Sequence, residues 1–107
     1  MDALPREIAE KIDEVRELCA KYGVKRLTLF GSAVKGTFDP ARSDVDFIVE
    51  LIPVGDAILE GRAYLGLWND LERLLGRRVD LVDPAGIVNP YLAASINESQ
   101  HALYEAA

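Results

Sequence analysis

Two aspartates, Asp44 and Asp46, stand two positions apart at the start of an apolar run. If that run forms a β-strand, both side chains project from one face, with their alpha carbons roughly 6.5 Å apart. Parallel carboxylates repel one another unless a cation or a basic group neutralises them. Carboxylate oxygens suit Mg²⁺, which binds through a few such ligands together with water and substrate phosphates. The pair therefore predicts a magnesium site.

A third carboxylate, Asp80, interrupts the apolar run over residues 78–82. Taken alone, it could cap a turn or pair with a neighbouring arginine. If its strand lies near that of Asp44 and Asp46, the three carboxylates can form one cluster. Such a cluster can hold two metal ions about 3.5–4 Å apart and serve an in-line displacement at phosphorus. We predict all three aspartates as catalytic residues and metal ligands.

A glycine and a serine, Gly31 and Ser32, follow the apolar segment that ends at Phe30. Glycine lets a phosphate approach the backbone closely, and free N–H groups at the start of a helical turn can cradle an anion. Ser32 adds a hydroxyl donor, and Lys35 in the same loop adds a point charge. A Gly-Ser dipeptide alone is commonly just a turn. The order of Gly-Ser, Asp-x-Asp and a later aspartate in an apolar strand is what favours a phosphate site.

Hydrophobic periodicity predicts the elements that would position these residues. Apolar residues at helical spacing predict helices over residues 5–22, 57–75 and 87–99. Short apolar runs predict strands over residues 26–30, 45–51, 78–82 and 102–104. This order predicts an α/β (α+β) fold in which a small mixed β-sheet is flanked by helices, and it leaves the strand order open.

One face of each long helix is expected to enter the core. In the first helix these residues are Ile8, Ile12, Val15, Cys19 and Tyr22. In the helix over residues 57–75 they are Ile58, Leu59, Leu65, Trp68, Leu71 and Leu75. The single cysteine is expected to be a small buried hydrophobe rather than a nucleophile.

Length and charge restrict the function further. The 107 residues predict a single domain over residues 1–107, and the formal net charge is −6. An acidic balance argues against direct nucleic-acid binding, but it permits an anionic nucleotide held through a metal. The chain shows neither a signal peptide nor an apolar stretch long enough to span a membrane, so the expected location is cytoplasmic.

The stretch over residues 29–49 resembles the signature of the DNA polymerase beta-like nucleotidyltransferase superfamily. It carries Gly31-Ser32, then Gly36, then Ser-Asp-Val-Asp at residues 43–46. Within the superfamily the chain looks most like the minimal nucleotidyltransferases (MNT), known as MntA-type antitoxins. The predicted element order and the small size agree with that group over nearly the whole chain.

The resemblance implies the nucleotidyltransferase fold and an enzyme that uses ATP with two Mg²⁺ ions per site. Asp44 and Asp46 then hold the metals that bind the triphosphate. Asp80 corresponds to the third carboxylate, which helps bind the catalytic metal and assists deprotonation of the acceptor hydroxyl. The predicted nucleotide-binding residues are Gly31, Ser32, Lys35 and Ser43. Lys35 departs from the pattern, because many relatives carry arginine there; lysine keeps the charge but loses bidentate phosphate binding.

The family reading also implies an acceptor. It predicts a protein adenylyltransferase that moves AMP from ATP to a tyrosine of a HEPN-domain toxin, as the antitoxin of a type VII-like toxin–antitoxin pair. One alternative is a non-catalytic antitoxin that neutralises its partner by binding. The other is nucleotidyl transfer to a small molecule such as an aminoglycoside. The oligomeric state, homomeric or heteromeric, stays open.

Overall fold

The computed structural model describes residues 6–30, 45–84 and 100–106 of the chain. Its elements are α1 (Arg6–Ala9), α2 (Ile12–Lys21), β1 (Val24–Phe30), β2 (Val45–Leu51), α4 (Ala57–Leu75), β3 (Val79–Val82) and β4 (Gln100–Glu105). Several predicted features lie outside the described residues: Gly31, Ser32, Lys35, Ser43, Asp44 and the helix over residues 87–99.

The described strands form one four-stranded sheet in the order β3-β2-β1-β4. β1 pairs antiparallel with both β2 and β4, whereas β2 and β3 are parallel. A parallel pair needs a long crossover connection, and α4 provides it between β2 and β3. The predicted mixed sheet flanked by helices is therefore confirmed.

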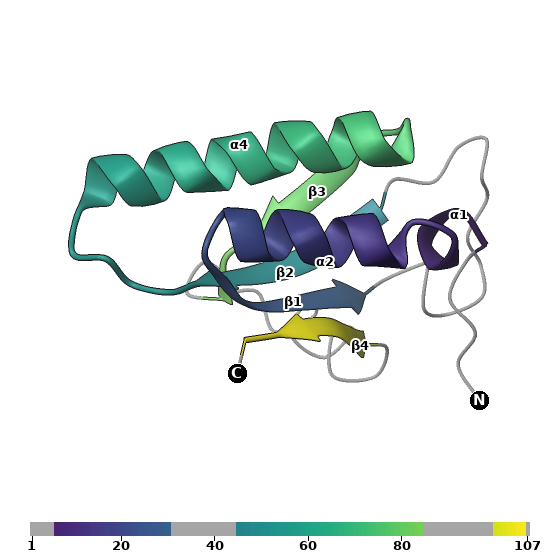
Figure 1. The fold of residues 1–107 in the computed structure, drawn as a ribbon, viewed down its shortest axis with the longest axis horizontal. Helices are drawn as coiled ribbons and strands as arrows, with labels where there is room; N and C mark the ends of the chain where they lie inside the picture. Colours follow the sequence, from purple (N-terminus) through teal and green to yellow (C-terminus); the bar gives the residue numbers. More distant parts are fainter. Residues whose placement is uncertain (1–5, 31–44, 85–99, 107) are drawn as a thin grey trace.

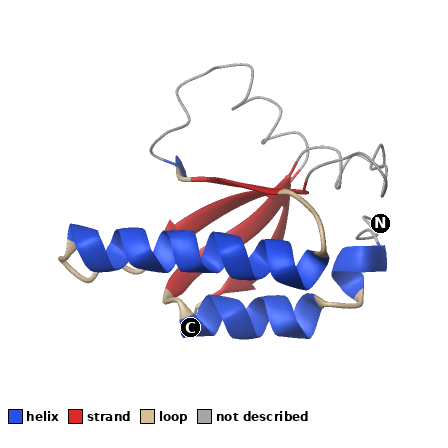
Figure 2. Ribbon diagram, turned by 90° about the horizontal axis from the view of Figure 1, so that it is seen from above, coloured by secondary structure: helices blue, strands red, loops and turns tan. Residues whose placement is uncertain are grey.

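Helices α2 and α4 pack side by side against one face of this sheet, as Figure 1 shows and Figure 2 shows from above. α2 contacts β1 and β4, and α4 contacts β3. Between the two layers lies the core, whose fully buried side chains include Ile8, Val15, Leu27, Leu29, Phe47, Val49, Leu67, Leu71 and Val79. No described helix is both long enough and apolar enough to cross a membrane.

Local signals determine both ends of α4. The Asp56 carboxylate accepts hydrogen bonds from the backbone N–H groups of Ile58 (2.9 Å) and Leu59 (3.2 Å), which makes it an N-cap. Gly76 ends the helix in the left-handed conformation, with φ of 65°, and its N–H donates to the Glu72 carbonyl. The predicted bounds, residues 57–75, are confirmed.

The predicted core face of α4 is wrong in its first half. Ile58, Leu59 and Leu65 are 69%, 53% and 65% exposed. The buried residues are Leu67, Leu71 and Leu75, which recur every four positions. The first half of α4 extends beyond the sheet (Figure 1), so its apolar residues have no sheet beneath them. Leu65 lies about 200° around the helix from Leu67, so it faces away from the core.

The prediction of one helix over residues 5–22 is also wrong, because the chain breaks between α1 and α2. Lys11 donates its N–H to the carbonyl of Ile8 at 3.0 Å, an i to i−3 bond that tightens the end of α1. Its φ of −111° and ψ of 10° are not helical. Ile8 lies in the core and Ile12 packs against the core. The apolar spacing therefore continues across the break, and the sequence pattern does not indicate where the helix is interrupted.

The strands agree closely with the prediction. β2 has the predicted bounds, and β3 begins one residue later than predicted. β1 begins two residues earlier, at Val24, and β4 extends over residues 100–105 instead of 102–104. Differences of one or two residues at element ends are ordinary, because end residues bond to only one neighbour.

Cys19 is fully buried on the core face of α2, as predicted. Burial raises the pKa of its thiol to about 12, because the apolar surroundings disfavour the thiolate. A thiol that keeps its proton at neutral pH is a poor nucleophile. Cys19 is therefore a packing residue.

Gly66 lets α2 approach α4 closely. A Cβ atom built there would lie 2.7 Å from Cε1 of the Tyr22 ring, whereas one at Gly61 would have no atom within 4 Å. The Tyr22 ring cannot yield easily, because its hydroxyl donates to Asp70 at 2.5 Å.

We therefore expect Gly66→Ala to destabilise the domain by about 1 kcal/mol, because overpacking outweighs the gain in helix propensity. Gly61→Ala, the matched control on the same helix, should stabilise it by about 0.5–1 kcal/mol. Urea unfolding monitored by circular dichroism measures both values. Equal stabilisation by the two substitutions would show that the Tyr22 ring moves aside freely.

Candidate active site

Two of the predicted site residues, Asp46 on β2 and Asp80 on β3, are direct register partners. Neighbouring strands lie about 4.8 Å apart, and partners in a parallel pair project from the same face. The two carboxylates therefore stand side by side on adjacent strands. Strand order creates this proximity, because 33 intervening residues separate the two positions along the chain.

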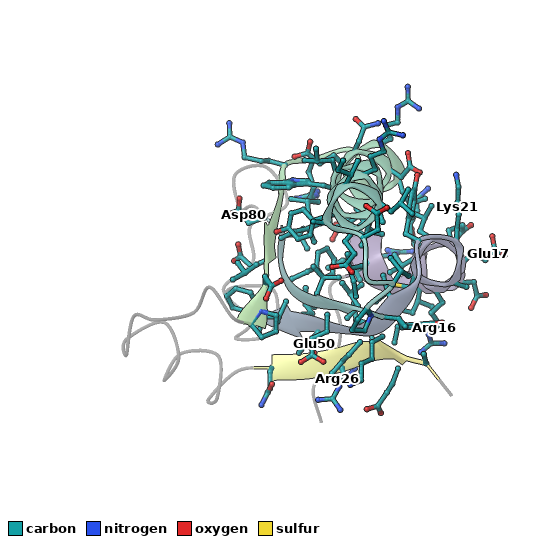
Figure 3. All side chains as sticks on the ribbon, turned by 90° about the vertical axis from the view of Figure 1, so that its left-hand side faces the viewer. Arg16, Glu17, Lys21, Arg26, Glu50 and Asp80 are labelled. Carbon is teal, nitrogen blue, oxygen red and sulfur yellow. The ribbon has the colours of Figure 1, made fainter. Side chains whose placement is uncertain are left out.

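The carboxylates lie on the face of the sheet opposite to the described helices α2 and α4. Their chain neighbours Val45, Phe47 and Val79 are fully buried on the helical side. Because side chains alternate along a strand, Asp46 and Asp80 project the other way. Asp46 is half-buried and Asp80 is exposed. Figure 3 shows Asp80 on the outer side of β3, far from the residues labelled on α2.

The strand ends that carry or adjoin the predicted site residues meet at one end of the sheet. Phe30, the last residue of β1, is the register partner of Asp46 and directly precedes Gly31 in the chain. Val45, the first residue of β2, directly follows Asp44 and donates its N–H to the Arg78 carbonyl at 3.1 Å. The end of β1 and the beginnings of β2 and β3 therefore meet at the level of the two carboxylates.

The donors in this row suit a hard divalent cation. Two carboxylates on neighbouring strands repel each other, and Mg²⁺ binds readily through one or two carboxylates plus phosphate oxygens. The described residues contain no cluster of three or more candidate metal ligands. Since Asp44 lies outside them, the cluster of three carboxylates stays a prediction, as do the roles of the Gly31-Ser32 segment, Lys35 and Ser43.

Glu50 shares the outer face of β2 but lies apart from this row. It is four residues beyond Asp46, about 13 Å along the strand, and its register partner on β1 is Arg26. The pKa of Arg26 is raised, first by its 2.6 Å ion pair with Glu105 and also by the charge of Glu50. Glu50 therefore lies near the Arg26–Glu105 ion pair, at the far end of the sheet.

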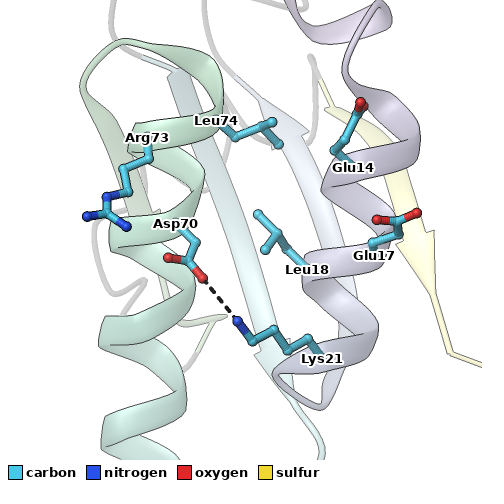
Figure 4. A pocket seen from close by; sticks show the side chains of 7 residues that line it. All are labelled: Glu14, Glu17, Leu18, Lys21, Asp70, Arg73 and Leu74. Atoms are coloured by element: carbon cyan, nitrogen blue, oxygen red, sulfur yellow. Dashed lines mark ion pairs between the residues drawn. The ribbon is translucent and has the colours of Figure 1, made fainter.

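A groove of about 460 Å³ lies on the helical side of the molecule, between α2 and α4. Figure 4 shows its lining, in which Lys21 and Asp70 form an ion pair of 3.7 Å. It opens on the face opposite to Asp80, and its charged groups include both signs. It is therefore separate from the candidate active site.

Side chains of α4 hold the outer edge of β3. The Tyr64 hydroxyl donates to the Leu81 carbonyl at 2.5 Å, and Trp68 Nε1 donates to the Val79 carbonyl at 2.6 Å. The Val79 N–H donates to Glu72 Oε2 at 3.0 Å. Helical spacing predicts Trp68 only as a core residue; the further signal in the sequence is three hydrogen-bonding side chains, Tyr64, Trp68 and Glu72, spaced four apart on one helix.

Comparison with known proteins identifies relatives of this chain. The family model described as "Nucleotidyltransferase domain" matches residues 12–102. A Methanocaldococcus jannaschii protein named "Putative protein adenylyltransferase MJ1379" is 38% identical over 93 residues, which cover 87% of this chain and 88% of that protein. Matches of this length extend from α2 to the last strand, well beyond the signature motif.

Two solved structures share the fold. One, the structure of a "putative minimal nucleotidyltransferase", is 30% identical with a TM-score of 0.63, covering 88% of this chain and 90% of its own. The other, a crystal structure of a toxin–antitoxin with AMP-PNP, is 26% identical with a TM-score of 0.65, covering 89% of this chain and 73% of its own. The family model and the relatives each span most of the chain, so this protein belongs to the nucleotidyltransferase domain family.

Proposed function

We propose that the protein transfers AMP from ATP to a tyrosine hydroxyl of a partner HEPN-domain toxin, with Mg²⁺, as the antitoxin of a type VII-like pair. The observation that carries the proposal is the register pairing of Asp46 with Asp80. The pair lies at the end of the sheet where β1 ends with Phe30, the residue before Gly31. The family membership fixes the reaction class as nucleotidyl transfer.

The proposed mechanism assigns roles to the predicted site residues. Asp44 and Asp46 would hold the metal ions, and Gly31 and Ser32 would bind the β and γ phosphates of ATP. Asp80 helps hold the catalytic metal and receives the proton of the acceptor hydroxyl. Mg²⁺ supplies charge neutralisation at the phosphate oxygens when it is bound.

The reaction forms one bond and breaks another. The acceptor oxygen attacks the α-phosphorus, and the bond between the α-phosphorus and the bridging oxygen breaks, so that pyrophosphate leaves. Most of the acceleration comes from holding the reacting groups in line and from stabilising the developing charge. Lys35 and Ser43 add contacts to the nucleotide in this proposal.

The choice of a protein acceptor is supported by the relatives. One solved relative is a toxin–antitoxin with AMP-PNP, an ATP analogue, and a curated relative is named a protein adenylyltransferase. The formal net charge of −6 suits docking to a basic, RNA-cutting partner. We further propose a cytoplasmic location and a single domain over residues 1–107; the core that joins the described elements from α1 to β4 supports the single domain.

Labelled ATP separates the proposal from its alternatives. The protein is incubated with α-labelled ATP, Mg²⁺ and the product of the adjacent gene, and the products are resolved by electrophoresis and mass spectrometry. AMP on a partner tyrosine supports the proposal. Neutralisation that survives Asp44→Ala plus Asp46→Ala would favour a binding antitoxin, and label on a small acceptor such as an aminoglycoside would favour the third reading.

A further inference from the structure

The outer edge of β3 is hydrogen-bonded by a helix instead of by another strand. β3 is the last strand of the described sheet, with β2 on its other side. Three side chains of α4, at Tyr64, Trp68 and Glu72, bond to the backbone of β3 as given above. We call these three residues the α4 ladder. Their spacing of four places them in one row along the helix, on the side that faces β3.

The backbone groups that the α4 ladder contacts belong to the residues on either side of Asp80. In a parallel strand, the N–H and C=O groups of one residue point to the same side, and successive residues alternate. The Arg78 carbonyl bonds to Val45 on β2, whereas Val79 and Leu81 bond to the α4 ladder. Asp80 is therefore hydrogen-bonded toward β2 while both of its neighbours are held from the opposite side.

The donors of the α4 ladder remain protonated at neutral pH. Burial raises the pKa of Tyr64, and the charge of Asp83 raises it further, so the hydroxyl keeps its proton. The indole N–H of Trp68 does not titrate in this range. The two rings also contact each other edge to face, with centroids 5.9 Å apart, which restricts their rotation. The α4 ladder is a connected unit of two half-buried aromatic residues and a carboxylate.

We propose that the α4 ladder positions Asp80: it fixes the four-residue strand β3 against α4, so that the Asp80 carboxylate stays level with that of Asp46. This inference rests on the proposed function of the same site. A strand of four residues bonded on one side only would shift readily along or away from its neighbour. A displacement of about 1 Å at a reacting group can lower the rate about 100-fold.

The test compares two tyrosine hydroxyls that make hydrogen bonds of the same length to different partners. Tyr64→Phe removes the hydroxyl that bonds to β3, and Tyr22→Phe removes a hydroxyl that bonds to Asp70 at the same distance of 2.5 Å, far from β3. We expect Tyr64→Phe to lower kcat about 10-fold, as for residues that orient a metal ligand, with KM for ATP within about twofold. Tyr22→Phe should leave both values unchanged while shifting the melting temperature comparably.

Three further variants test whether the hydrogen bonds themselves hold Asp80 in position. Tyr64→Phe combined with Trp68→Phe should lower kcat about 100-fold. Glu72→Gln keeps an oxygen that accepts the Val79 N–H, so it should retain activity, whereas Glu72→Leu should not. Retained activity in Glu72→Leu, or equal losses in Tyr64→Phe and Tyr22→Phe, would overturn the inference.

Measurements independent of catalysis separate this inference from the proposed function. Amide hydrogen exchange should become about tenfold faster at Asp80 in Tyr64→Phe than in Tyr22→Phe, and Mn²⁺ binding, followed by electron paramagnetic resonance, should weaken. If the wild-type protein transfers no nucleotide, the proposed function fails, and the exchange and Mn²⁺ results alone decide whether the α4 ladder orders Asp80. If kcat is unchanged although exchange accelerates, the positioning role fails and the proposed function stands.

Discussion

Asp80→Asn is expected to lower kcat for nucleotidyl transfer about 10³-fold, equivalent to about 4 kcal/mol of transition-state stabilisation. The substitution preserves the size of the side chain but removes its charge, which the proposed reaction needs for metal binding and for taking the acceptor proton. Asp80 is exposed, so its effect on folding should be small, within about 0.5 kcal/mol. Steady-state rates with labelled ATP and urea unfolding of the same samples measure both quantities.

Glu50→Gln is the matched control for Asp80→Asn. Glu50 also carries a carboxylate on the outer face of the sheet, but it is paired in register with Arg26 instead of with a second acid. Its substitution should leave kcat within about twofold. A second check is Asp46→Asn: because both acids serve one site, combining it with Asp80→Asn should cost little more than either alone. Full activity of Asp80→Asn in saturating Mg²⁺ would exclude the proposed mechanism.

Phe47→Ala is expected to destabilise the domain by about 3–5 kcal/mol, the largest stability effect among the predictions made here. Phe47 is fully buried at the centre of the sheet, with Leu29 and Leu81 as its register partners on the two flanking strands. Removing its ring leaves a cavity in the core between the sheet and the described helices. The free energy of unfolding of a small domain is only about 5–15 kcal/mol, so the variant should lose a large part of it. Urea unfolding followed by far-ultraviolet circular dichroism measures the loss.

Ile48→Ala gives the comparison for Phe47→Ala. Ile48 is the next residue along β2 and points to the outer face, where it is only half-buried. Its truncation should cost clearly less, about 1–2 kcal/mol. Equal costs at the two positions would mean that the sheet is packed equally on both faces, whereas the described helices α2 and α4 cover only one of them (Figure 2).

Elements with their own end signals could be predicted closely from the sequence. β2 and α4 have the predicted bounds, because Asp56 and Gly76 cap the helix through local hydrogen bonds and backbone conformation. The break at Lys11 could not be predicted, since the apolar spacing of Ile8 and Ile12 passes through it unchanged. The exposed face of α4 was missed for another reason: which residues are buried depends on where the sheet ends beneath the helix.

For the candidate site too, one part could be predicted from the sequence and another part could not. Asp46 and Asp80 stand out in the sequence as acids in apolar strands, and their chemistry follows from residue type alone. Their proximity depends on the order β3-β2-β1-β4, which no local pattern determines. The role of the α4 ladder could not be predicted from the sequence, because Tyr64 and Trp68 have the spacing of ordinary core residues. Only the position of β3 beside the helix shows that their polar atoms bond to its backbone.

The hydrogen bonds along β3 also affect how the protein behaves in concentrated solution. A terminal strand of apolar, β-branched residues such as Val79 and Val82 is the kind on which a second chain can add a strand and begin aggregation. Here an incoming strand would first have to displace the bonds that α4 already makes to this backbone. Intermolecular sheet growth from this side of the molecule is therefore disfavoured by the bonds to α4, in addition to the charges of Arg78, Asp80 and Asp83 and the Pro84 that follows the strand.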